Sequence, residues 1–116
     1  MRNSQFLFFG HKLSSQHYTK LAGFKGESAL KICDIADRYG VKCMMGCMLE
    51  GNVAVTAAAH AAMARGVITK IDLDGPALCK TNPVIGGAQF NDSIITPSAG
   101  AGFGIERIED LVPLTI

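Results

Sequence analysis

Apolar residues recur at steps of three and four between residues 27 and 39, which is the spacing of an amphipathic helix. Gly40 follows as a C-terminal stop. Residues 41–49 then form a short, almost wholly apolar run, which is typical of a strand buried on both faces of a parallel sheet. The predicted buried stripe of the helix consists of Ala29, Ile32, Cys33, Ala36 and Tyr39.

The same order of helix and strand then repeats. Gly51 and Asn52 supply turn and N-cap chemistry, and the Ala-rich residues 53–65 predict a second helix that ends before Gly66. Residues 67–73 are the next strand candidate, and Gly75-Pro76 ends it sharply. Helix, strand, helix and strand joined by short connections predict parallel β/α architecture.

The pattern changes beyond Pro83. Residues 88–96 contain two short apolar segments around Asn91-Asp92, which predicts a hairpin with a tight turn. The glycine-rich residues 100–104 are predicted to be irregular. They are a poor phosphate loop, because no convincing helix opens from them.

Composition favours a packed globular domain, with 48% hydrophobic and 18% charged residues. The net charge of +1 comes from scattered residues, so we expect neither a nucleic acid nor a membrane as partner. No stretch is long enough for a membrane span or a signal-peptide core. The four cysteines include no C-x-x-C pair, which favours free, buried thiols and a cytoplasmic protein.

Candidate chemistry lies at the end of the second predicted strand. Asp72 and Asp74 are two residues apart, so alternation places both carboxylates on one face, with Ile71 and Leu73 on the other. Two like charges this close favour a cation between them, either an ammonium group or a metal. The plain alternative is that both carboxylates face solvent or cap a turn. Their position favours a site, because parallel barrels assemble active sites at the carboxyl ends of strands.

Three motifs follow one another along the chain, namely GCMLE at 46–50, TAAAH at 56–60 and ITKIDLDGP at 68–76. In this order they resemble the dipeptide epimerases of the enolase superfamily. The resemblance covers roughly residues 20–106 and implies part of a (β/α) TIM barrel, with about the last three β/α units and a C-terminal hairpin and return segment. Residues 1–18 stay unassigned, 19–87 correspond to the barrel units, and 88–116 to the hairpin and the return towards a capping domain.

The resemblance implies a role for each residue that matches a motif. Asp72 and Asp74 would bind the α-ammonium group of a dipeptide. Cys47 and Leu49 would contact the substrate largely through backbone groups, and Glu50 would form a neighbouring wall. His60 is read as a packed helix residue without a role.

The resemblance also implies a catalytic lysine that moves a proton at the α-carbon. Lys20 is the match, although the segment around it lacks the paired glycines of the family and aligns only with a one-residue gap. Lys25 is the alternative. Two solvated lysines without a role are the plain reading.

A dianionic intermediate next to a carboxylate needs a metal or strong donors. The resemblance implies Mg²⁺ held by three acidic residues on earlier strands, but residues 1–18 contain no Asp or Glu, so we expect the metal ligands to lie outside this chain. We therefore expect half a site, no activity alone, and association as a homo-oligomer or with a complementary barrel chain. The alternative function is a non-catalytic truncated remnant or interaction module.

Overall fold

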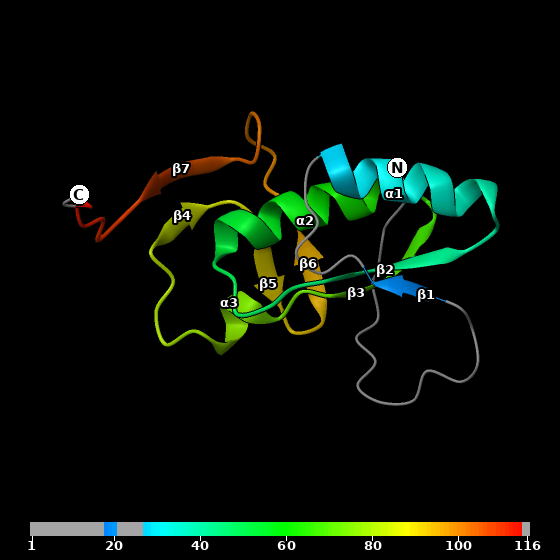
Figure 1. Ribbon diagram of the computed structural model, residues 1–116. Coiled ribbons are helices and arrows are strands. Elements are labelled where there is room, and N and C mark those ends of the chain that lie inside the picture. Colours follow the sequence, from blue (N-terminus) through cyan, green and yellow to red (C-terminus); the bar gives the residue numbers. More distant parts are fainter. Residues whose placement is uncertain (1–17, 21–26, 115–116) are drawn as a thin grey trace.

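The computed structural model describes residues 18–20 and 27–114 (Figure 1). Its centre is a parallel sheet of three strands in the order β1-β2-β3, namely β1 (Tyr18–Lys20), β2 (Lys42–Gly46) and β3 (Ile68–Asp72). Helix α1 (Glu27–Arg38) connects β1 to β2, and α2 (Asn52–Ala64) connects β2 to β3. The predicted α/β order is therefore confirmed.

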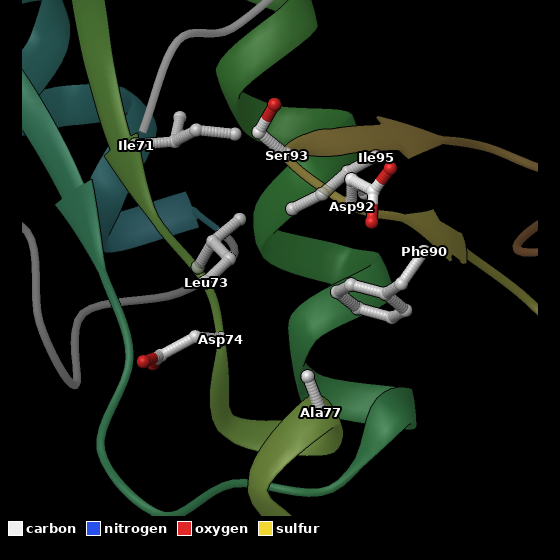
Figure 2. A pocket seen from close by; sticks show the side chains of 8 residues that line it. All are labelled: Ile71, Leu73, Asp74, Ala77, Phe90, Asp92, Ser93 and Ile95. Atoms are coloured by element: carbon white, nitrogen blue, oxygen red, sulfur yellow. The ribbon is translucent and has the colours of Figure 1, made fainter. Parts of the chain in front are cut away.

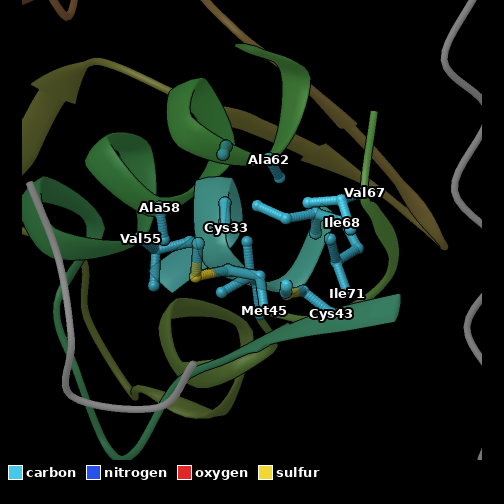
Figure 3. Close-up of a cluster of buried hydrophobic side chains, with 12 residues drawn as sticks. Cys33, Cys43, Met45, Val55, Ala58, Ala62, Val67, Ile68 and Ile71 are labelled. Atoms are coloured by element: carbon cyan, nitrogen blue, oxygen red, sulfur yellow. The ribbon is translucent and has the colours of Figure 1, made fainter. Parts of the chain in front are cut away.

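Both helices lie over one face of the sheet, and the hydrophobic core fills the space between them and the strands (Figure 3). The face of β2 that carries Cys43 and Met45 is fully buried against the helices. Alanines at 58, 59 and 62 let α2 approach closely, because their side chains occupy little space. The largest fully buried side chains of this core include Met45, Leu73, Val55 and Cys33.

Three details of the predicted elements are wrong. Tyr39 lies beyond the end of α1 and is 79% exposed, so the helix stripe ends at Ala36. Strand β2 ends at Gly46 instead of residue 49, because the chain bends away and leaves Met48 and Leu49 exposed. The N-cap of α2 is Gly51, which belongs to the predicted pair Gly51-Asn52. Cys79 is exposed, unlike the buried thiols that were expected.

The C-terminal part consists of short elements that follow the β/α units. The predicted hairpin is confirmed as β5 (Gln89–Asn91) and β6 (Ile94–Thr96), which pair antiparallel. Its turn residues are Asp92 and Ser93, one position later than predicted, and Asp92 has a φ of 50°. Three further elements were not predicted, namely α3 (Gly75–Leu78), β4 (Val84–Gly86) and its antiparallel partner β7 (Ile105–Ile108).

Among the described residues, the helices are too short to cross a membrane. The longest of them, α2, has 13 residues.

Candidate binding site at the carboxyl edge of the sheet

The candidate site lies where the parallel strands end. Gly46 at the end of β2 is in register with Asp72 at the end of β3. The next residue, Cys47, donates its backbone N–H to the carbonyl of Asp72 at 3.0 Å. Because parallel strands end at the same edge, the segment after β2 meets the segment after β3 there.

Cys47 brings the predicted acidic residues together. Its half-buried thiol donates to Oδ1 of Asp74 at 3.9 Å, a long contact that is acceptable for sulfur. Burial raises the pKa of the Cys47 thiol and outweighs a hydrogen bond from the Gly75 backbone that lowers it, and the nearby carboxylates of Asp74, Asp72 and Glu50 raise it further. The thiol is therefore protonated at neutral pH, which leaves it a hydrogen-bond donor and a poor nucleophile.

The two aspartates are more exposed than Ile71 and Leu73, the apolar residues that alternate with them. Asp72 and Asp74 are half-buried, whereas Ile71 and Leu73 are 8% and 2% exposed. Figure 2 shows the carboxylate of Asp74 directed towards β2, on the opposite side from the groove into which Leu73 points. Asp74 has helical backbone angles because it is the N-cap of α3, so regular strand alternation ends at Asp72.

Gly75 allows the two segments to approach each other. A Cβ atom at this position would lie 2.8 Å from the carbonyl oxygen of Glu50 and 3.0 Å from that of Met48. Any side chain would therefore push the segment after β2 away from Asp74. From the sequence, Gly75-Pro76 was interpreted only as the end of a strand. The available signal was a glycine directly after Asp74, the second aspartate of the pair.

The hairpin forms a wall behind the aspartates. A cavity of about 60 Å³ separates the end of β3 from the hairpin, and its lining is mainly apolar (Figure 2). Leu73 and Ile71 of the β3 side face Phe90 and Ile95 of the hairpin across it. Asp74 also belongs to the lining of this cavity, although its carboxylate is directed towards β2.

The other predicted site residues lie at the same edge of the sheet or close to it in the chain. Leu49 is 88% exposed, and Glu50 is half-buried with its N–H donated to the carbonyl of Met48 at 2.8 Å. The backbone of Lys20 is in register with Met44, at the same carboxyl edge of the sheet. Lys25 lies outside the described residues.

No group of three or more His, Cys, Asp or Glu side chains among the described residues could hold a metal ion. The donor set at the carboxyl edge therefore does not fit the Mg²⁺ that the family implies.

His60 packs as expected, with its ring 5.3 Å from that of Phe103 between centroids. Its buried Nε2 has no hydrogen-bond partner in this part of the chain.

Comparison with known proteins identifies the family of this chain. The family described as "Enolase C-terminal domain-like" matches residues 19–111. The L-Ala-D/L-Glu epimerase of Clostridium acetobutylicum is 55% identical over 83 residues, which are 72% of this chain and 23% of that protein. The L-Ala-D/L-Glu epimerase of Bacillus subtilis is 40% identical over 86 residues, which are 74% of this chain and 23% of that protein.

A solved structure gives the same result. The dipeptide epimerase of Enterococcus faecalis V583, complexed with Mg and the dipeptide L-Leu-L-Tyr, is 41% identical with a TM-score of 0.62. The match covers 67% of this chain and 23% of that one. This chain thus spans about a quarter of the length of the curated relatives it matches. It belongs to the enolase C-terminal domain-like family.

Proposed function

We propose that this chain provides the ammonium-binding part of a Mg²⁺-dependent dipeptide epimerase, an isomerase acting on the α-carbon of a dipeptide such as Ala-Glu. The observation that carries the proposal is the pair of half-buried carboxylates at the end of the parallel strand β3, where Asp72 is the last strand residue and Asp74 follows two positions later. The curated relatives from Clostridium acetobutylicum and Bacillus subtilis, both L-Ala-D/L-Glu epimerases, support the reaction class.

The chemistry of the carboxylates suits a primary ammonium group. An ammonium donates three hydrogen bonds and carries one positive charge, and the two carboxylates supply acceptors and the opposite charge. The protonated thiol of Cys47 occupies one acceptor position on Asp74. The nearby residues 47–50 line the same edge, where backbone groups at Cys47 and Leu49 would contact the dipeptide and Glu50 would form a side wall.

Lys20 is the proposed catalytic residue. The resemblance gives a lysine at this strand end the task of removing or returning the proton at the α-carbon of the second residue. The backbone of Lys20 ends β1 at the same sheet edge as Gly46 and Asp72, which supports that choice. Lys25 remains the alternative.

We propose that the chain alone binds the dipeptide without turning it over. The E. faecalis enzyme is complexed with Mg, whereas the described residues of this chain hold no group of three metal ligands. Proton transfer next to a carboxylate needs charge stabilisation that these residues do not supply. The partial barrel would also favour association, either with copies of itself or with a complementary barrel chain.

Calorimetric titration with L-Ala-L-Glu tests the binding proposal. We expect Asp72→Asn to weaken binding about tenfold or more, because a charged hydrogen-bond partner of the ammonium is lost. Asp92→Asn is the matched control, since it removes the same charge from the hairpin turn on the other side of the groove. Equal affinities for Asp72→Asn and the unsubstituted chain would rule out the ammonium role.

Exchange of the dipeptide α-proton in D₂O tests the proposed lack of turnover by the chain alone. We expect no deuterium in the glutamate Cα position after incubation with the homogeneous chain, with or without Mg²⁺. Mg²⁺-dependent exchange would contradict the proposed lack of turnover, and an absence of any dipeptide binding would favour the non-catalytic interaction module.

A further inference from the structure

Two polar side chains on α2 pair with both backbone groups of Ala88. The Thr56 hydroxyl accepts a hydrogen bond from the Ala88 N–H at 2.8 Å. The Asn52 side-chain amide donates to the Ala88 carbonyl at 3.2 Å, and its amide oxygen accepts from the Thr56 hydroxyl at 3.3 Å. Both residues are buried, at 3% and 0% exposed, and their four-residue spacing places them on one helix face.

The segment before Ala88 is shaped to reach this pair. Gly86 and Gly87 have φ values of 86° and 76°, in the left-handed region that favours glycine. A Cβ on Gly87 would lie 2.9 Å from the Thr56 hydroxyl oxygen, and the Asn52 amide also lies 3.5 Å from the Gly86 carbonyl oxygen. The backbone therefore approaches α2 at distances that a side chain on Gly87 would prevent.

Ala88 connects this contact to the wall behind the aspartates. It directly precedes β5, whose Phe90 lines the groove together with Ile95. Across the groove lies Leu73, the residue between Asp72 and Asp74 (Figure 2). The position of Ala88 thus sets where the hairpin packs against the segment that carries both carboxylates.

The other end of the contact lies next to the site as well. Asn52 is the first residue of α2 and follows Glu50 and Gly51. The Asn52 side chain therefore lies at the start of the helix that continues the segment 47–51. Through its hydrogen bond to Ala88, it also holds the hairpin that packs opposite Leu73. One buried contact connects both segments that form the carboxyl-edge site.

We propose that Asn52 and Thr56 are positioning residues, which fix the segment 47–51 relative to Asp72 and Asp74 by holding Ala88 against the first turns of α2. The functional meaning of this inference rests on the proposed function. The proposed positioning of the segment 47–51 at the carboxyl edge of the sheet can be tested without any substrate.

Thr56→Val is the informative substitution. Valine keeps the branched shape but removes the hydroxyl, so the buried Ala88 N–H and the Asn52 amide oxygen each lose a partner. Thr56→Ser restores the hydroxyl and is the conservative rescue. Ile68→Ala is the matched control, because Ile68 is buried in the same core at the opposite end of β3.

The readout is the pH profile of Cys47 alkylation by iodoacetamide, followed by peptide mass spectrometry in a Cys79→Ser background that removes the exposed thiol. We expect Thr56→Val to shift the profile to lower pH by about half a pKa unit or more, which is about threefold more thiolate below the pKa. The direction follows because burial is the largest cause of the raised Cys47 pKa and exceeds the opposing effect of the Gly75 backbone hydrogen bond, so that admitting water at a loosened edge lowers the pKa. Thr56→Ser and Ile68→Ala should keep the original profile, although Ile68→Ala lowers the melting temperature.

Equal profiles for Thr56→Val and Ile68→Ala would overturn the inference, since the pair would then act only through overall stability. Hydrogen exchange in the unsubstituted protein supplies a check that needs no variant: the Ala88 amide should exchange as slowly as the amides of β2 and β3, and fast exchange would also overturn it. A shifted Cys47 profile together with no dipeptide binding would uphold this inference and reject the proposed function.

Discussion

The β/α region of residues 27–73 and the C-terminal region of residues 84–108 are held in place by different forces. Nearly all of the buried apolar side chains belong to the β/α region, where α1 and α2 pack on β2 and β3. In the C-terminal region only Val84 and Ala88 are buried hydrophobic residues. Phe90 and Ile95 of the hairpin pack against the core but are only partly buried, and the region also depends on left-handed glycines and on hydrogen bonds to α2.

The difference assigns separate tasks to the two regions. Apolar burial supplies most of the free energy of folding and has little directional preference. Hydrogen bonds to buried groups contribute less but fix one geometry, because an unpaired buried group costs free energy. The β/α region therefore determines whether the chain folds, and the C-terminal region determines how the wall behind Asp72 and Asp74 is placed.

The largest expected effect is in the β/α core. Met45→Ala should lower the free energy of unfolding by about 2–5 kcal/mol, because Met45 is fully buried and its loss leaves a cavity. Urea unfolding followed by circular dichroism measures the change. Met48→Ala is the control, since Met48 is 68% exposed and its truncation should change stability by no more than about 0.5 kcal/mol. Similar losses for both variants would contradict the placement of the core.

The same core should lose stability at alkaline pH. Burial and the neighbouring Cys43 raise the pKa of the Cys33 thiol from about 9 to about 11. The raised pKa leaves stability intact below pH 9 and removes about 2–3 kcal/mol as pH rises through 11, because only the unfolded thiol ionises freely in that window. Urea unfolding at pH 8.5, 9.5 and 10.5 should show a steeper decline for the unsubstituted chain than for Cys33→Ala. Parallel declines would argue against a buried, protonated Cys33.

A smaller effect is expected in the C-terminal region. Gly87→Ala should destabilise the chain by about 1–2 kcal/mol from its left-handed backbone alone, with a further cost from the contact with Thr56. Gly66→Ala is the control, because an added Cβ there meets no atom within 4 Å. Thermal unfolding of both variants measures the contrast. If Gly87→Ala were as stable as Gly66→Ala, the close approach to α2 would be wrong.

The smallest effect is expected for the ion pair between the two helices. Arg65 Nε lies 3.2 Å from Asp34 Oδ1, and both side chains are substantially exposed. Asp34→Asn should therefore cost less than about 1 kcal/mol and should lose its effect in high salt. Asp37→Asn, an exposed acid on the same helix, is the comparison in low and high salt. A loss that persists in high salt would show that the pair is more buried than described.

The two regions also differ in how well the sequence predicted them. Periodic apolar positions predicted α1, because a helix that buries one face must repeat that pattern. A continuous apolar run predicted β2, and an Ala-rich segment between turn residues predicted α2 and placed β3 after it. The end of β2 was misplaced because Met48 and Leu49 are apolar yet exposed. Local pattern cannot identify a strand end that is set by the approach of Gly75.

In the C-terminal region only the hairpin was predicted, since Asn91-Asp92 marks a turn within the sequence itself. The pairing of β4 with β7 joins residues about twenty positions apart and depends on Gly86 and Gly87, so no local period announces it. The residues of the candidate site also divide into those with a local sequence signal and those that depend on a distant contact. Asp72 and Asp74 carry a sequence signal, whereas Asn52 and Thr56 gain their role only through contact with Ala88.

The central claim is that Asp72 and Asp74 bind an ammonium group at the carboxyl edge of the sheet. The most direct measurement is an NMR titration of the isotope-labelled chain with L-Ala-L-Glu and, separately, with N-acetyl-L-Ala-L-Glu, which lacks the charged amine. We predict saturable shifts of the Cys47, Asp72 and Asp74 amides with the free dipeptide and none with the acetylated one. Equal shifts with both ligands, or none with either, would contradict the claim.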